Sequence, residues 1–438
     1  METLQNRLQQ VHDLIEVLER SRDMLVSYAT EDTSFTLREC NMELNIVLER
    51  LRGFEMMVPV FEKREPISGT GEEVALVLPY NGSAWLNTTI VSVYLVGNKV
   101  RVKFASRDSK IARFTESLYK PIFGDDIQFD YSEGKTFIEK AISDPAIPAI
   151  CLFGSDRHAL PYEKAIKTRK KKFVFEGPGK DPFIVFSGAN IEEAARELAF
   201  SKYIYAGQTC TAPERVYLEE SIHDEFVDIF LELSRSVKVG DPRDPETEMG
   251  PVASDLAIEN IKRQLDDAIK RGGKILLGGK IEGNYVYPTI VVNSTEEMLG
   301  MQEETFGPVV FIQAFDNVDM ALSLARNNRY GLRATVYGPE KKASTVAEEL
   351  VGEEYCHPVE KMTFGRFGTV AVNQTRAESW KGAFVWKPVG GYGYSGWIWE
   401  TIRDNFILKQ GPKLLSLETS TGEFSVEELP YLRPEKTI

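Results

Sequence analysis

The sequence predicts an α/β protein built on doubly wound parallel sheets, and three observations lead to that prediction. Short, continuous apolar runs such as residues 74–78 and 149–153 are typical of strands that are buried on both faces. Amphipathic helical patterns separate these runs along the chain. Polar or glycine-rich residues directly follow several runs, at the carboxyl ends of strands, where the ligands of such sheets bind.

Composition narrows the class of protein. The chain has 438 residues with 42% hydrophobic and 27% charged residues, which fits a globular protein of two or three domains. A net charge of −14 argues against nucleic acid or an anionic membrane as partner. We find neither an apolar run near the roughly 20 residues of a membrane span nor an export signal at the start. We therefore expect no nucleic-acid partner and no membrane.

Cysteine and histidine usage indicates a reducing compartment and no metal site. The four cysteines are widely scattered, which is not the pattern of a disulfide framework. With four histidines and no Cys-x-x-Cys motif, we expect no bound metal. The expected localisation is cytoplasmic.

The first α/β unit is expected to end near residue 176, after two amphipathic helices and at least four strands. Apolar residues at helical spacing predict helices within 4–26 and 44–54. A connecting helix is expected from Thr89 to Leu95. The expected strands cover residues 74–78, 99–103, 149–153 and 173–175.

A second α/β unit is expected from 177 to 400, followed by a C-terminal segment from 401 to 438. Asn190 is the expected N-cap of a helix that runs to Tyr203, because Glu193 follows it by three residues. Further helices are expected at 223–236, 257–271 and 319–327, and strands at 182–186, 215–218, 272–276, 287–292, 309–315 and 334–337.

One cysteine and one glutamate carry the chemistry. Cys210 follows a small, flexible Ala-Gly turn that can present its sulfur to a substrate, and Glu176 lies 34 residues upstream on a glycine-rich turn. A nucleophilic thiol and a carboxylate base are the two groups needed to form a thioester and then hydrolyse it. Taken singly, a cysteine is more often a small buried hydrophobe and such a glutamate a turn residue.

Several segments, in order along nearly the whole chain, resemble the aldehyde dehydrogenase superfamily. Residues 175–180 resemble its Glu-Leu-Gly-Gly-Lys segment, 207–210 its nucleophile segment, and 304–308 its Glu-x-Phe-Gly-Pro motif. Shorter matches occur at residues 79–81, 240–242, 249–251 and 390–396. The resemblance implies a fold of two doubly wound α/β domains, one for the cofactor and one for catalysis, with a small oligomerisation arm.

The resemblance also implies catalytic roles. Cys210 would attack the carbonyl of a small-molecule aldehyde, and the side-chain amide of Asn81 with the backbone N–H of Cys210 would hold the oxyanion. Hydride would pass to a nicotinamide and leave a thioester. Glu176 would then activate water and release the carboxylic acid. Read without the resemblance, Asn81 is a common turn residue.

The cofactor roles implied by the resemblance fall on both domains. Lys103 would contact the adenosine ribose, and Gly154 with Ser155 would pack against the pyrophosphate. Glu304 would hold the nicotinamide ribose, and Phe306 would press on the nicotinamide side of the site. The expected cofactor is NADP or NAD.

Departures from the family pattern keep two alternatives open. Pro178 stiffens the loop of Glu176, Ala159 replaces a glycine after the pyrophosphate turn, and only 80 residues precede Asn81. A CoA-acylating dehydrogenase is one alternative, although Glu176 argues against it. A catalytically lapsed binding protein on the same fold is the other.

Residues 412–418 resemble the family's oligomerisation strand, so we expect a homodimer.

Two residues near Lys103 predict that NADP is accepted. Many NAD-dependent members carry a glutamate where this chain has Ser106, followed by Arg107. A carboxylate there repels a 2′-phosphate, whereas serine removes that repulsion and arginine would add attraction. We expect turnover with NADP at a kcat/KM at least equal to that with NAD, measured by steady-state kinetics with each cofactor. Strict use of NAD would contradict this.

Overall fold

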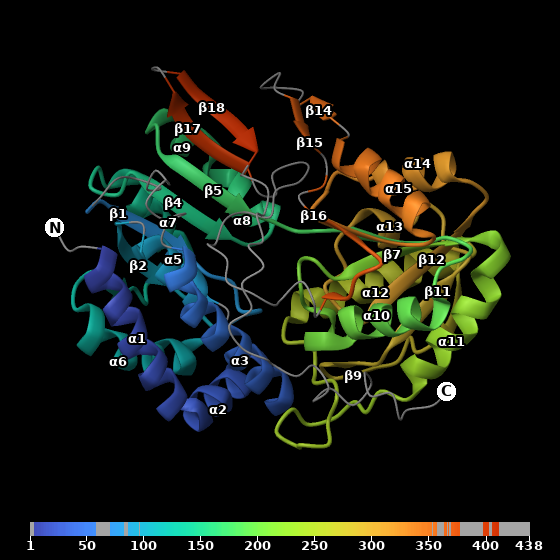
Figure 1. The fold of residues 1–438 in the computed structure, drawn as a ribbon, viewed down its shortest axis with the longest axis horizontal. Coiled ribbons are helices and arrows are strands. Elements are labelled where there is room, and N and C mark those ends of the chain that lie inside the picture. Colours follow the sequence, from blue (N-terminus) through green and yellow to red (C-terminus); the bar gives the residue numbers. More distant parts are fainter. Residues whose placement is uncertain are drawn as a thin grey trace.

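Two seven-stranded sheets, each with helices packed against it, form two lobes that lie side by side (Figure 1). The computed structural model describes residues 4–57, 71–82, 86–95, 97–352, 354–356, 363–365, 367, 369–376, 397–402 and 405–410. Each lobe has its own apolar core. The expected fold class, an aldehyde dehydrogenase-like pair of doubly wound α/β domains, is confirmed.

The first sheet has the strand order β18-β17-β5-β4-β1-β2-β3. Its five central strands are parallel, and the β17–β18 hairpin adds antiparallel strands beside β5. The strands are β1 Glu73–Val77, β2 Lys99–Lys103, β3 Ile127–Phe129, β4 Ala149–Phe153, β5 Lys172–Glu176, β17 Trp397–Ile402 and β18 Asn405–Gln410. The chain order reverses between β1 and β4, so the carboxyl ends of these two strands open a crevice for ligands.

The helices of the first lobe cover both faces of this sheet, with α1, α2, α3 and α6 grouped on one side (Figure 1). They are α1 Leu4–Arg20, α2 Arg22–Thr33, α3 Leu37–Gly53, α5 Leu86–Leu95, α6 Ser109–Phe123, α7 Gly134–Ser143, α8 Asp156–Ala159 and α9 Glu163–Thr168, with the 3-10 turns η1 Phe54–Met57 and η2 Leu160–Tyr162. The single helix expected within 4–26 is wrong, because α1 ends at Arg20 and α2 begins at Arg22.

The second sheet has the strand order β16-β13-β6-β7-β12-β11-β8, parallel except for the edge strand β8. The strands are β6 Asp181–Val185, β7 Pro213–Glu219, β8 Lys274–Leu277, β11 Thr289–Val292, β12 Val309–Phe315, β13 Arg333–Tyr337 and β16 Thr369–Val372. Nearly every residue of β6 and β7 is buried, which explains why these strands read as continuous apolar runs.

Four of the described helices of the second lobe, α10, α11, α12 and α14, begin and end within two residues of the expected bounds. The described helices of this lobe are α10 Ile191–Tyr203, α11 His223–Arg235, α12 Asp255–Lys270, α13 Leu299–Gln302, α14 Val318–Arg326 and α15 Glu340–Gly352, with the turns η3 Ile204–Gly207 and η4 Glu220–Ile222. Asn190 is the N-cap of α10 and accepts a hydrogen bond from the Glu193 N–H, as expected. Two small antiparallel pairs remain, β9 Ile281–Glu282 with β10 Tyr285–Val286, and β14 Glu354–Cys356 with β15 Thr363–Gly365.

Other expectations were incomplete or fall on residues outside this description. The strand β3 was not expected, because it has only three residues. The helices α6, α7, α13 and α15 were not expected either. The segment 412–418 and the motif at 390–396 lie outside the described residues. No helix in the described part of the chain is both long enough and apolar enough to cross a membrane.

The helix α3 braces the segment that leads to Cys210. Thr36 and Glu39 form a capping box at its start, and the second oxygen of the Glu39 carboxylate accepts a hydrogen bond of 2.6 Å from the backbone N–H of Tyr205. Burial raises the pKa of Glu39 from 4.5 to about 7, against the opposing effect of these N–H donors.

We predict that Glu39→Gln flattens the pH dependence of unfolding. Between pH 4.5 and 7 the folded protein retains a proton on Glu39 that the unfolded chain releases, so the free energy of unfolding falls as pH rises. The variant lacks this titration, and its loss of stability between pH 4.5 and 7 should be smaller by about 3 kcal/mol, at 1.36 kcal/mol per pKa unit. Urea unfolding at several pH values measures the difference, and parallel profiles for the two proteins would refute the prediction.

Candidate active site

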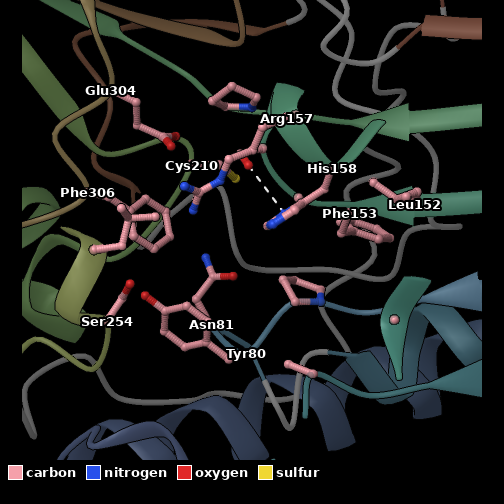
Figure 2. Close-up of a pocket in the computed structure, with 18 of the residues that line it drawn as sticks. Tyr80, Asn81, Leu152, Phe153, Arg157, His158, Cys210, Ser254, Glu304 and Phe306 are labelled. Carbon is pink, nitrogen blue, oxygen red and sulfur yellow. Dashed lines mark hydrogen bonds between the residues drawn. The ribbon is translucent and has the colours of Figure 1, made fainter. Parts of the chain in front are cut away.

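A cavity of about 950 Å³ lies in the cleft, where the carboxyl ends of β1 and β4 face the second lobe (Figure 2). Tyr80 and Asn81 follow β1, whereas Gly154 and Ser155 follow β4, so the cavity occupies the crevice that the strand order creates. Cys210 reaches it from the second lobe.

A left-handed turn carries Cys210 into the cavity. After α10 the chain places Tyr205 and Ala206 at φ values of 55° and 52°, followed by Gly207 at 74°. A Cβ atom on Gly207 would lie 2.3 Å from the carbonyl oxygen of Gly307, so only glycine permits this close packing. The turn reverses the chain and leaves Cys210 half-buried.

The surroundings of Cys210 favour its neutral thiol. Burial raises its pKa, and the nearby charges of Glu176, Glu304 and Asp181 raise it further, against the opposing charge of Arg376. The thiol is therefore protonated at neutral pH, and a nucleophilic sulfur requires removal of its proton during the reaction.

Gln208 orients Asn81 through its backbone and Tyr80 through its side chain. The Asn81 amide nitrogen donates to the backbone carbonyl of Gln208 at 2.9 Å, and the Tyr80 hydroxyl donates to its side-chain oxygen at 3.0 Å. The same oxygen accepts from the Ala253 N–H at 2.8 Å, and the side-chain nitrogen donates to the Tyr205 carbonyl at 2.9 Å. One hydrogen of the Asn81 amide is thus used for orientation, and its nitrogen is directed toward the side of Cys210 (Figure 2).

The glycine-rich loop of Glu176 contacts both lobes of the site. Glu176 ends β5, is only 5% exposed and lines the cavity. The Gly179 N–H donates to a carboxylate oxygen of Glu304 at 3.0 Å. A Cβ atom on Gly179 would lie 2.1 Å from the carbonyl oxygen of Cys210, so this loop packs directly on the backbone of the cysteine.

A buried ion pair holds the segment of Glu304 and Phe306. The Lys180 ammonium lies 2.8 Å from Glu214, and both side chains are almost fully buried. The Glu214 carboxylate accepts from the backbone N–H groups of Thr305 and Phe306 at 2.7 and 2.9 Å. Burial alone would raise the pKa of Glu214, but Lys180 and Lys202 outweigh it and lower the pKa. The ionised carboxylate keeps Phe306 in the left-handed region at a φ of 56°.

The structure brings eight of the ten residues expected from the sequence to this one cavity. Lys103 and Arg107 are not among the residues that line it. The Lys103 ammonium donates to the Phe104 carbonyl at 3.2 Å. Arg107 donates to the carbonyl oxygens of Asp32 and Ala253 and thereby ties α2 to the second lobe. The residues on the cavity wall are Asn81, Ser106, Gly154, Ser155, Glu176, Cys210, Glu304 and Phe306.

The sequence alone did not predict the residues that orient the site. Gln208 was expected only as part of a motif, and Glu214 was not noticed. A charged residue within the apolar strand β7 was the available signal for Glu214. Arg376, whose guanidinium donates to the Thr211 carbonyl at 2.8 Å, supports the loop just after Cys210.

The comparisons with known proteins agree with this geometry. The sequence profile of the aldehyde dehydrogenase family matches residues 2–406, and the chain belongs to that family. As a member it is an oxidoreductase that acts on the aldehyde group with NAD or NADP.

Two relatives and one solved structure are similar to this chain over much of its length. D-glyceraldehyde dehydrogenase (NADP(+)) of Picrophilus torridus is 27% identical over 87% of this chain and 78% of its own length. Succinate semialdehyde dehydrogenase [NAD(P)+] of Escherichia coli is 30% identical over 65% of this chain, and the match spans only 62% of that protein. The fold matches succinic semialdehyde dehydrogenase of Streptococcus pyogenes with a TM-score of 0.79 at 23% identity, over 96% of this chain and 91% of that one.

We predict slow alkylation of Cys210 at neutral pH. Because its pKa is raised, the thiolate fraction should grow about tenfold per pH unit from pH 7 to 9 without reaching a plateau. The measurement is the rate of iodoacetamide labelling of the Cys210 peptide by mass spectrometry. The same peptide in the urea-unfolded protein serves as control, with a plateau just above its ordinary pKa of about 8.5. A plateau below pH 8 in the folded protein would contradict the raised pKa.

Proposed function

We propose that this protein oxidises an aldehyde to its carboxylic acid through a thioester on Cys210. The observation that carries the proposal is the convergence of Cys210, Glu176 and Asn81 on one cavity wall, from three separate segments of the chain. A nucleophile, a base and an oxyanion donor are the groups that this reaction needs.

In the first half-reaction, the Cys210 sulfur attacks the carbonyl carbon of the aldehyde. The raised pKa of the thiol means that its proton must leave as the new carbon–sulfur bond forms. Glu176 is the carboxylate at the end of β5 that shares the cavity, and it takes this proton and passes it to solvent. Loss of the hydride from the tetrahedral carbon then leaves a thioester.

The oxyanion that forms during attack is stabilised by Asn81. One amide hydrogen of Asn81 is held by the Gln208 carbonyl at 2.9 Å, so the second is aimed by a fixed side chain and needs no reorganisation. The backbone N–H of Cys210 is the second donor. Removal of one such donor typically slows the reaction by about 10²–10³.

The cavity residues fit a nicotinamide dinucleotide. Its volume of about 950 Å³ and its place at the strand switch point suit a ligand of that size. Gly154 and Ser155 would pack against its pyrophosphate, Glu304 would hold the nicotinamide ribose, and Phe306 would bound the nicotinamide. The oxidised nicotinamide, when bound, accepts the hydride. Ser106 on the cavity wall supports acceptance of NADP without help from Arg107.

In the second half-reaction, Glu176 takes a proton from water, and the resulting hydroxide attacks the thioester carbon. The carboxylic acid leaves and the thiol is restored. The carboxylate of Glu176 on the cavity wall favours water over CoA as the acyl acceptor. The named activities of relatives make glyceraldehyde and succinate semialdehyde the first aldehydes to test.

We further propose a cytoplasmic homodimer. The scattered cysteines support a reducing compartment. Among the described strands, β18 ends the first sheet, and an edge strand is a natural site for pairing with a second subunit. Light scattering of the purified protein measures the assembly.

We predict that Glu176→Gln stops turnover after the first half-reaction. The variant should release about one reduced cofactor per subunit in a burst that is slower than in the wild type, because solvent must then accept the thiol proton. It should retain an acyl group on Cys210, because the attacking water has lost its base. Stopped-flow absorbance measures the burst, and the intact mass of the protein shows the acyl group.

The control is Cys210→Ser, which should give no burst. Addition of CoA to the arrested Glu176→Gln enzyme separates the two possible acceptors, since rapid release of an acyl-CoA would favour the CoA-acylating alternative. Unchanged turnover in both variants would refute the proposed mechanism, whereas the absence of turnover in the wild type with every aldehyde tested would favour a lapsed binding protein.

A further inference from the structure

The turn after β4 carries a cation that the mechanism does not use. Arg157 lines the cavity and is exposed there, three residues after Gly154. In Figure 2 its side chain extends from the end of the strand into the cavity. No carboxylate of the described residues forms an ion pair with it, whereas the other cations on the cavity wall have such neighbours. Arg263 pairs with Glu303, and Lys135 lies 3.9 Å from Glu139.

The side chains on both sides of Arg157 have polar partners. A carboxylate oxygen of Asp156 lies 2.8 Å from the guanidinium of Arg329 and accepts a 2.8 Å hydrogen bond from the Tyr330 hydroxyl, both on the second lobe. On the other side, Nδ1 of His158 lies 3.3 Å from the Ser155 hydroxyl. These contacts hold the backbone of the turn in place, so the base of the Arg157 side chain has a fixed position at the cavity.

The short helix α8, which contains Arg157, offers an anion few positive groups apart from side chains. The helix α8 has only four residues, and the His158 N–H already donates to the Ser155 carbonyl at 2.8 Å. A helix of one turn has a weak dipole and few free N–H groups to offer an anion. The positive charge at this turn must then come from a side chain. Burial and Arg157 both lower the pKa of His158, so the imidazole is neutral at neutral pH and leaves Arg157 as the cation.

We propose that Arg157 binds the diphosphate of the nicotinamide dinucleotide through charge-assisted hydrogen bonds. This inference rests on the cofactor binding of the proposed function. A diphosphate carries two negative charges, and a guanidinium can contact two of its oxygens at once. Arg157 follows β4, which β1 separates from β2 in the sheet. Neighbouring strands lie about 4.8 Å apart, so the end of β4 is about 10 Å from the end of β2. At the end of β2, Ser106 would meet the 2′-position of the adenosine ribose. Arg157 is thus a ligand for the diphosphate that NAD and NADP share.

The test is the equilibrium dissociation constant of each cofactor, measured by fluorescence titration for wild type, Arg157→Gln and Arg157→Lys. Loss of a charge-assisted hydrogen bond predicts about a tenfold or larger rise in Kd for both NAD and NADP in Arg157→Gln. The slope of log Kd against log salt should become shallower, since one cation no longer contacts the diphosphate. The lysine variant should recover part of the affinity.

Arg169→Gln is the matched control, because it removes the same charge from an exposed arginine of the same lobe outside the cavity. It should bind both cofactors as wild type does. ADP-ribose and adenosine locate the contact, since Arg157→Gln should weaken ADP-ribose and leave adenosine unchanged. An unchanged Kd, or a rise confined to NADP, overturns the assignment of Arg157 while the proposed function stands. Failure of the wild type to bind either dinucleotide overturns the proposed function as well.

Discussion

The carboxylate of Glu214 is the group on which the catalytic cleft depends. It lies four residues after Cys210, is buried, and joins Lys180 to the backbone of Thr305 and Phe306. Burying a lone carboxylate would be very unfavourable, so its stability requires two ammonium groups and two N–H donors at once. These contacts of Glu214 hold the loops of Cys210, Glu176 and Glu304 in place relative to each other.

Close backbone packing completes this arrangement. Gly179 packs on the Cys210 carbonyl and Gly207 packs on Gly307, each at a separation that no Cβ atom could occupy. A second brace comes from the other lobe, where Glu39 on α3 accepts the N–H of Tyr205. The helix α3 therefore contacts the turn that precedes Cys210, in addition to covering the first sheet.

The short charged segment after β4 lines the cavity and also contacts the second lobe. Asp156 is bound by Arg329 and Tyr330 across the cleft, and its neighbour Arg157 faces the cavity. A ligand that contacts Arg157 therefore touches the same turn that joins the two sheets. The cavity is bounded by both lobes, which is where dinucleotide sites of doubly wound folds occur.

The sequence by itself determined most strands of the two sheets and several helices, such as α10, α11, α12 and α14, and its motifs predicted the residues to which we assign the chemistry. Buried parallel strands leave continuous apolar runs, and Cys210, Glu176, Asn81 and Glu304 stand in motifs whose chemistry is local. Only the tertiary structure decided which charged groups face the cleft. Arg107 was expected to attract the 2′-phosphate of NADP. Its guanidinium instead donates hydrogen bonds to the carbonyls of Asp32 and Ala253, which are distant in sequence. Arg157 has no carbonyl or carboxylate partner among the described residues, and its side chain points into the cavity. The orientation of a long side chain depends on hydrogen-bond acceptors that folding brings near it. These acceptors cannot be predicted from the periodicity and spacing of residues along the chain.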